Sequence, residues 1–323
     1  MAKLKDINEM KFLFENWREF NFLNEKINSL SSDPACRFVA DCLVEVAKVD
    51  DILIPEREMV AIRKWGKLEG SPIFLGSGSR GSAYKFGDRV LKFTHDRSEV
   101  SAAALLVGKA HPNVYNVYAV GKRNRQNLEN SDLNFKHAIY IIVYEFLEYP
   151  TRAMALVAQL LNEKIRSSKD GSLFYSWGES NLSEAKELIR EFVKSVKEDP
   201  SLLGEPSEKF GNILPKIEVM ARSLGWSNRQ HKLFEISWTL IGGAYTQNLN
   251  SPVAVERYAS KIIVDSRLDY FHQLALGLTF LKSVGVIFDD LKNTNVMQKN
   301  GQVVIIDVGK SRVQKRPEIP EIS

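Results

Sequence analysis

Apolar positions recur every three or four residues near the start of the chain, which is the spacing of a helix with one apolar face. The first such stripe consists of Ile7, Met10, Leu13, Trp17 and Phe20. A second helix is expected to begin at Asp33-Pro34, where a capping carboxylate precedes a proline that suits the first helical turn. The pattern predicts a third helix over residues 55–65. We therefore expect residues 1–70 to form a helical N-terminal extension.

After residue 71 the pattern changes to short apolar runs bounded by turn residues, which is typical of β-strands. Gly87-Asp88 separates two of these runs and predicts a hairpin turn. One helical segment, residues 98–109, follows the third run. The expected strands cover residues 73–75, 82–86, 89–93, 114–120 and 138–146. This order predicts an α+β fold, with a five-stranded sheet and one helix over residues 71–149.

The remainder of the chain, residues 150–323, is predicted to be mostly helical, with a large insert over about 151–265. Residues 183–197 are amphipathic, and a helix over 268–281 leads into a loop segment at 285–310. Aromatic side chains of the insert are expected in the core rather than on a substrate surface. These residues are Phe174, Tyr175, Trp177, Trp226 and Trp238.

Composition narrows the class of protein. The chain has 44% hydrophobic and 26% charged residues with a formal net charge of +4, as in an ordinary globular protein. Its Lys and Arg residues form no strong nucleic-acid-binding stripe. Cys36 and Cys42 point to different faces of one helix, which favours free thiols in a reducing compartment. Residues 138–147, the most apolar run, are too short to span a membrane. We expect a cytoplasmic protein, of the producing cell or of a host cell, with an undefined oligomeric state.

A glycine-rich segment lies between the first two expected strands. Gly76, Gly78 and Gly81 fit the pattern G-x-G-x-x-G, which also occurs in dinucleotide-binding proteins. There the glycines lead from a strand into a helix, whereas here a strand follows them. A hairpin whose backbone N–H groups approach phosphates therefore fits better, and a hairpin with purely structural glycines is the alternative.

The segment 285–309 places carboxylate, lysine and asparagine side chains at short, fixed intervals. The pattern Asp290-Leu-Lys292-x-x-Asn295, with Asp307-x-Gly309 after a short apolar run, resembles the catalytic and metal-binding loops of the protein kinase superfamily. The resemblance implies a bilobal kinase-like fold that binds ATP and Mg²⁺. By the same resemblance, Asp290 accepts the proton of the substrate hydroxyl and Lys292 neutralises the phosphoryl group. Asn295 and Asp307 then hold Mg²⁺.

The resemblance extends to the first half of the chain. Val90-Leu91-Lys92 resembles the kinase strand whose lysine holds the α- and β-phosphates. Glu99, on the following helix, is the expected ion-pair partner of Lys92, and Asp96 is the alternative.

The segment 144–147 is expected to be the hinge between the two lobes. Its position, at the end of the last apolar strand, implies that backbone groups of Glu145 and Leu147 meet the adenine ring and that Tyr144 is the gatekeeper.

Three positions depart from the kinase pattern. Phe288 and Val308 replace a histidine and a phenylalanine that normally pack together, and Asp289 replaces an arginine that senses a phosphorylated activation loop. The sequence also continues for only 14 residues beyond Gly309. We therefore expect no control by activation-loop phosphorylation, and we expect the insert at 151–265 to replace the missing C-terminal helices. Compact kinases of bacteriophages and bacterial effectors resemble this plan.

The sequence thus predicts an ATP- and Mg²⁺-dependent phosphotransferase, with a serine/threonine protein kinase acting on a protein substrate as the first hypothesis. The Asp-Leu-Lys order favours it, because aminoglycoside phosphotransferases and related small-molecule kinases usually lack this lysine. Three alternatives stay open: a small-molecule kinase, a nucleotide-binding pseudokinase that acts as a scaffold, and a nucleotidyl transferase on a kinase fold.

Overall fold

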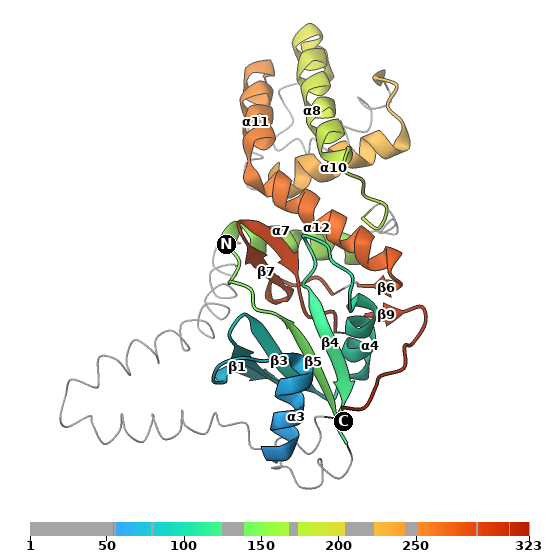
Figure 1. Cartoon of the computed structure of the whole chain (residues 1–323). Helices are drawn as coiled ribbons and strands as arrows, with labels where there is room; N and C mark the ends of the chain where they lie inside the picture. Colours follow the sequence, from blue (N-terminus) through green and yellow to red (C-terminus); the bar gives the residue numbers. More distant parts are fainter. Residues whose placement is uncertain are drawn as a thin grey trace, which may run out of the picture. The chain divides into compact units, whose positions relative to one another are not determined.

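The computed structural model describes most of the chain from residue 54 onward (Figure 1). The described residues are 54, 56–78, 81–124, 139–167, 174–203, 223–242, 251–288, 290–309 and 311–322. The first two expected helices, Cys36 and Cys42 lie outside them. The chain divides into two compact units, one of Met1–Leu53 with Pro72–Phe74 and one of Ile54–Ser71 with Leu75–Ser323. The elements and contacts below belong to the second unit, apart from the first residues of β1.

The expected five-stranded sheet is present. Its spatial order is β1-β2-β3-β5-β4, and β3 pairs antiparallel with both β2 and β5. Gly87 has a φ of 57° in the turn between β2 and β3, a conformation that glycine adopts without strain. The strands are β1 (Ile73–Gly78), β2 (Gly81–Phe86), β3 (Arg89–Thr94), β4 (Val117–Lys122) and β5 (Tyr140–Glu145). The prediction of an α+β fold is confirmed.

One helix, α4 (Arg97–Leu106), connects β3 to β4 through a loop. Asp96 caps this helix, because its Oδ1 accepts hydrogen bonds from the N–H groups of Ser98 at 2.9 Å and Glu99 at 3.3 Å. β4 begins three residues later than predicted. The preceding residues bond elsewhere: Tyr115 donates its N–H to Ile305 at 2.9 Å.

The helix before the sheet, α3 (Glu56–Gly66), confirms the third predicted helix. Its Glu58 is buried and forms a two-pronged ion pair with Arg123, which directly follows β4. The Nε–Oε1 distance is 2.6 Å and the Nη2–Oε2 distance is 2.8 Å. Arg123 is itself only 1% exposed, so both charges are removed from water together. This pair fixes α3 to the sheet.

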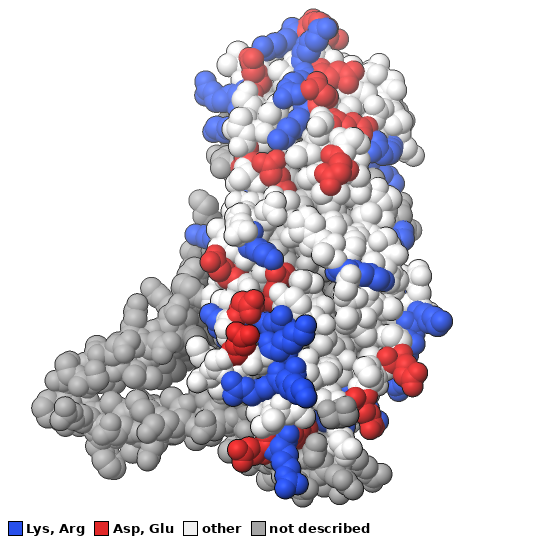
Figure 2. Space-filling view, in the orientation of Figure 1, with Lys and Arg blue, Asp and Glu red and all other residues white. Residues whose placement is uncertain are grey.

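Helices predominate after the sheet, as predicted. Ser251 and Asp265 cap α11 and α12 with their side chains, and Pro252 opens α11. The helices are α7 (Arg152–Ser167), α8 (Asn181–Glu198), α10 (Asn228–Gly242), α11 (Pro252–Val264) and α12 (Ser266–Ser283), with a 3-10 turn, η3 (Pro200–Leu203), after α8. Acidic and basic side chains are interspersed where α8 and α11 face solvent (Figure 2).

Aromatic side chains fill the core of these helices. Phe192, Phe234 and Trp238 pack with ring centroids 5.0–5.3 Å apart. Phe174, Trp177 and Trp238 are each at most 2% exposed, while Tyr175 and Trp226 are partly buried against the same core. The expectation that the aromatic residues of the insert form core is confirmed.

Short elements follow α12 and return the chain to the sheet. They are β6 (Val286–Ile287), η4 (Asn293–Asn295), β7 (Val296–Lys299), β8 (Gln302–Ile305) and β9 (Arg312–Val313). Ile305 donates its N–H to Asn113 at 2.9 Å, which bonds β8 to the loop after α4. Gly277 on α12 permits this contact, since a Cβ there would lie 2.9 Å from the Asn113 carbonyl oxygen. Within the described segments, no helix is both long enough and apolar enough to cross a membrane.

Candidate active site

Three segments of the chain bring charged side chains together beside β3, the central strand of the sheet. Lys92 comes from β3, Glu99 from α4 and Asp307 from the loop after β8. The Lys92 ammonium lies 2.5 Å from Glu99 Oε1 and 3.3 Å from Asp307 Oδ2. The ion pair that the sequence predicts between Lys92 and Glu99 is therefore present, and Asp96 serves as the helix cap instead.

Burial and charge act against each other in this cluster. Burial disfavours the charged form of Lys92, but the carboxylates of Glu99 and Asp307 outweigh it and hold the pKa of Lys92 above its ordinary value. Burial raises the pKa of Glu99 to about 7, against the opposing effect of the Lys92 ammonium. Lys92 therefore stays positively charged at neutral pH and can bind an anionic ligand.

Asp307 has an unusual backbone conformation. Its φ is 47°, in the left-handed region that residues other than glycine rarely adopt. Its Oδ1 accepts a hydrogen bond from Gly309 N–H at 3.3 Å, and its side chain is 43% exposed. A strained residue at a partly open carboxylate is typical of a functional site.

The second cluster lies on the loop around η4. Lys292 Nζ is 3.1 Å from Asp290 Oδ2, and Asn295 Nδ2 donates to the carbonyl of Asp290 at 2.8 Å. The Asp290 side chain is 17% exposed, so its carboxylate is largely enclosed but reachable. Ile306 donates its N–H to the carbonyl of Asn295 at 2.9 Å, which brings the backbone of Asp307 beside this loop. The four predicted catalytic and metal-binding residues thus lie on adjoining backbone segments.

The oxygen atoms of Asn295 and Asp307 fit a hard cation such as Mg²⁺. The Asn295 amide nitrogen is bound to Asp290, and its Oδ1 accepts a hydrogen bond from Thr294 Oγ1 at 3.2 Å. An amide oxygen has a second lone pair, through which Oδ1 could act as a ligand. Among the described residues, no group of three or more His, Cys, Asp or Glu side chains could hold a metal ion alone. A cation at this position therefore needs further oxygens, which the phosphates of a nucleotide supply.

Two of the positions that depart from the kinase pattern lie in the hydrophobic core, beneath the loops of Asp290 and Asp307. Phe288 and Val308 are fully buried, and the Phe288 carbonyl accepts a hydrogen bond from Tyr175 OH at 2.8 Å. The insert thereby supports the catalytic loop directly. Asp289 lies outside the described residues, so its role as a lost phosphate sensor stays a prediction.

The predicted hinge follows β5. Among the described residues, Leu147 N–H bonds to no backbone carbonyl, while Glu148 and Gln298 exchange two backbone bonds at 2.9 and 3.1 Å. The Glu145 N–H is already bonded to Asn116 O at 3.0 Å, so it is not available to an adenine ring. Adenine binding by the carbonyl of Glu145 and by the backbone of Leu147 stays a prediction.

The side chain of Glu145 has a function that the sequence did not suggest. Its carboxylate is buried, accepts the N–H of Asn116 at 2.9 Å and pairs with Lys299 on β7. The hinge is thereby bound to the β7–β8 hairpin. No sequence pattern could identify this pair, because its members are separated by 154 residues.

Two tyrosines lie beside the charged cluster. Tyr144, the predicted gatekeeper, contacts Tyr115 edge-to-face with ring centroids 5.4 Å apart. Burial, and then the carboxylates of Glu99 and Asp307, raise the pKa of Tyr115 well above its ordinary value. Tyr115 was not predicted as a site residue, since an isolated tyrosine after an Asn-Val pair carries no pattern.

The glycine segment is described in part, because residues 79 and 80 lie outside the described residues. Gly76 has a φ of 150°, and a Cβ there would have no neighbour within 4 Å. A Cβ on Gly81 would lie 1.9 Å from the Phe93 carbonyl oxygen, so close packing of β2 on β3 explains this glycine. Gly78 ends β1. Phosphate binding by Gly76, Gly78 and Gly81 stays a prediction.

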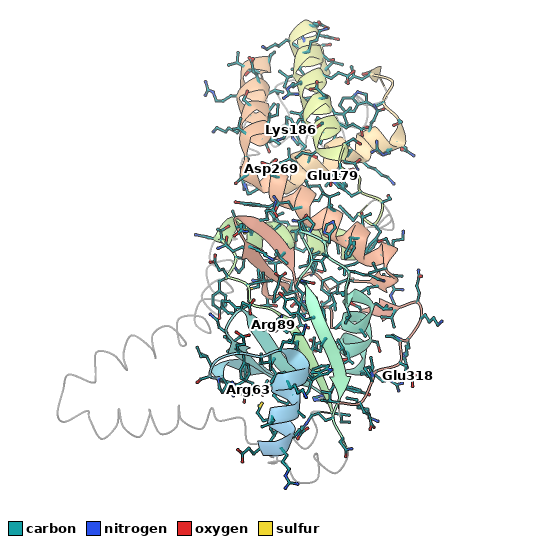
Figure 3. All side chains as sticks on the ribbon, in the orientation of Figure 1. Arg63, Arg89, Glu179, Lys186, Asp269 and Glu318 are labelled. Carbon is teal, nitrogen blue, oxygen red and sulfur yellow. The ribbon has the colours of Figure 1, made fainter. Side chains whose placement is uncertain are left out.

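Polar contacts elsewhere connect helices. Lys186 on α8 and Asp269 on α12 approach to 3.2 Å, and Glu179 lies nearby (Figure 3). His272 accepts a hydrogen bond from Trp177 Nε1 at 2.8 Å, and burial lowers its pKa. These contacts position α12 against α8 and share no residue with the two clusters above.

No family model and no curated protein matches the chain. Among solved structures, the chain is similar to the streptomycin–ATP ternary complex of APH(2″)-IIa, with 13% identity, a TM-score of 0.28 and coverage of 81% of this chain and 74% of that one. It is also similar to a thermostable mutant of the aminoglycoside phosphotransferase APH(4)-Ia, with 10% identity, a TM-score of 0.22 and coverage of 70% and 97%. At these scores the likeness carries no argument. The fold description rests on the sheet order and the helix positions.

Proposed function

We propose that this protein is an ATP-dependent phosphotransferase of the protein-kinase type. One observation carries the proposal: a largely enclosed lysine on β3 is paired with a buried glutamate on α4 and with the strained Asp307, next to the Asp290–Lys292 loop. A fold keeps a buried ion pair at a cost in desolvation, which favours a functional reason for it. In this proposal Lys92 binds the phosphates of ATP, and the backbone of Leu147 binds its adenine edge.

Asp290 is the proposed base and orienting group. Its enclosed carboxylate accepts the proton of an acceptor hydroxyl and directs the oxygen at the terminal phosphorus. Lys292, 3.1 Å from that carboxylate, then supplies positive charge to the group in transfer. Bound Mg²⁺, held by Asn295 and Asp307, would supply charge neutralisation on the phosphate oxygens. Positioning and electrostatics account for the whole reaction, since no covalent intermediate is needed.

We propose serine or threonine hydroxyls of a protein as the acceptor. Lys292 supports this substrate class, because the Asp290-Leu-Lys292 order resembles that of serine/threonine protein kinases and its ammonium lies 3.1 Å from the Asp290 carboxylate. The small-molecule alternative uses the same base and is distinguished only by the acceptor.

The test presents labelled ATP with Mg²⁺ to the wild-type protein, to Asp290→Asn and to Lys292→Met. A protein mixture and a panel of hydroxylated metabolites serve as acceptors in separate reactions. We expect label in protein with the wild type and a loss of about 10²–10⁴-fold with Asp290→Asn. Label in a metabolite alone would replace the protein-kinase proposal with the small-molecule one. ATP binding without turnover would favour a scaffold, and transfer of AMP would favour nucleotidyl transfer.

A further inference from the structure

A segment after the metal-binding loop connects the catalytic loops to the far edge of the sheet. This segment, residues 312–322, is called the strap. At its start β9 pairs antiparallel with β6, so that Val313 lies opposite Val286 and Arg312 opposite Ile287. Gln314 then donates its N–H to Gly285 at 3.0 Å. The strap thus begins on the strand that leads into the Asp290 loop.

The other end of the strap lies along β4, which is an edge strand in the order β1-β2-β3-β5-β4. Lys122 donates its N–H to the carbonyl of Pro320 at 2.8 Å, and Ile322 donates to the carbonyl of Lys122 at 3.0 Å. These two backbone bonds form one isolated parallel bridge between Lys122 and Glu321, which pairs the last residue of this edge strand.

Ile322 fixes this end by close packing. Its side chain is 9% exposed and lies over Gly121 of β4. A Cβ on Gly121 would approach Ile322 Cγ1 to 2.6 Å and the Trp65 ring to 2.9 Å, so only glycine fits beneath it. The end of the strap is thus packed against β4 and against α3, which carries Trp65.

Helix α4 lies between these two anchors. Figure 1 shows the strap descending beside α4 from β9 to the end marked C, and Glu318 on this segment is labelled in Figure 3. β9 contacts α4 directly, and the partly buried Val313 and Ile319 pack against the hydrophobic core. α4 also carries Glu99, which pairs with Lys92. The strap and the ion pair therefore contact the same helix.

We propose that the strap is a positioning device that holds α4 where Glu99 meets Lys92. The inference rests on the proposed phosphotransfer, because it gives the Lys92–Glu99 pair its purpose. A helix displaced by a few ångströms breaks a contact of 2.5 Å, and misplacement of a phosphate-binding group by that much lowers turnover strongly. Release of the strap from β4 would therefore stop phosphotransfer.

The test disrupts the contact between Ile322 and Gly121, once from the strap and once from β4. Ile322→Asp places a charge over Gly121, and Gly121→Ala intrudes on Ile322 from β4. Hydrogen exchange of the free protein reports on α4 without any substrate. We expect exchange of the α4 amides to rise about tenfold or more in both variants while the β3 and β5 amides keep their protection. The kcat for phosphotransfer should fall about tenfold or more, with a smaller change in the KM for ATP.

Two control variants accompany the test. Val264→Asp makes the same kind of change at a residue of α11 that is 81% exposed, and it should alter neither exchange nor kcat. Ile322→Val keeps the contact and should retain the α4 protection.

Two results would overturn the proposal. In the first, the substitutions release Ile322 but the α4 amides keep their protection from exchange. The strap would then pair the edge of β4 without holding α4. In the second, β3 and β5 lose protection together with α4, so that the strap is needed for the fold as a whole. A wild-type protein without transfer activity would refute the proposed function instead, and the exchange data would still report on the strap.

Discussion

The sheet with its adjoining loops and the inserted helices differ in where their charge pairs lie. In the sheet region, charge pairs are enclosed: Arg123 and Glu58 are buried, and the side chains of Lys92 and Glu99 are 16% and 3% exposed. In the helices, charge pairs lie nearer the surface, as for Arg229 with Glu184, whose side chains are 49% and 26% exposed. The core of the helices is formed instead by apolar and aromatic side chains such as Phe234.

Unlike Arg123 with Glu58, the Lys92–Glu99 pair also contacts a partly exposed carboxylate, Asp307, which indicates where the chemistry lies. A buried charge is costly unless a partner compensates it, so a region that contains several such pairs has retained them against that cost. Exposed ion pairs such as Lys197 with Glu256 contribute about 0–1 kcal/mol each and need no functional reason. The inserted helices therefore act as support for the catalytic loop, for example through Tyr175 and Phe288.

The largest effect is expected for Asp290→Asn. The amide keeps the size of the side chain but cannot accept the proton, so transfer should fall about 10²–10⁴-fold. ATP affinity and the free energy of unfolding should change little, because the pairs around Lys92 remain. Steady-state kinetics, isothermal titration with ATP and urea unfolding measure the three quantities. An equal loss of activity in Asp269→Asn, on a helix outside the site, would contradict the separation of the two regions.

A large effect on stability alone is expected for Arg123→Met. This change leaves Glu58 buried without its partner and should lower the free energy of unfolding by about 3–5 kcal/mol. The double variant Glu58→Leu, Arg123→Met removes both charges and should be less destabilised than Arg123→Met. Urea unfolding of the wild type, the single variant and the double variant gives the three free energies of unfolding. Additive losses in the double variant would show that the pair is not the source of the effect.

A comparable loss of stability is expected in the helices for Phe234→Ala. Its ring packs between Phe192 and Trp238, so a cavity should cost about 3–5 kcal/mol. At a temperature where the variant is folded, the KM for ATP should equal that of the wild type. A raised KM in the folded variant would show that the helices take part in nucleotide binding.

The smallest effect concerns pH. Burial raises the pKa of Glu99 from an ordinary 4.5 to about 7. Between these values the native state binds more protons than the unfolded chain, so stability falls as pH rises through this window. Glu99→Gln removes this dependence. The change in the free energy of unfolding across this pH window should therefore be smaller than in the wild type by on the order of 1–3 kcal/mol. Unfolding measured from pH 4.5 to pH 8 tests it. Parallel curves for the two proteins would contradict the burial of an ionisable Glu99.

Local patterns predicted the elements of the fold well. The helix expected over 98–109 is Arg97–Leu106, and the one over 268–281 is Ser266–Ser283. Asp96 and Asp265 cap these helices, a start signal that the sequence also carries. The strands agree to within a few residues. β4 is the exception, since its expected first residues bond to β8, and no local pattern shows that competition.

The site was predictable only where residues lie within a short segment or follow a family spacing. Asp290, Lys292 and Asn295 belong to one loop, so their proximity follows from the sequence. The Glu58–Arg123 and Glu145–Lys299 pairs join residues 65 and 154 positions apart, and the strap joins β6 to β4. Such contacts depend on how the elements pack, which neither periodicity nor turn residues determine.

The central claim is that Lys92, Glu99, Asp307 and Asp290 form one phosphotransfer site. Its most direct test is intact-mass measurement of the wild-type protein, and of its acceptor, after incubation with ATP and Mg²⁺, beside Asp290→Asn. The account predicts the mass of added phosphate and the release of ADP for the wild type, and neither for Asp290→Asn, although both proteins bind ATP. Addition of AMP, or equal and unchanged masses in both proteins despite ATP binding, would contradict it.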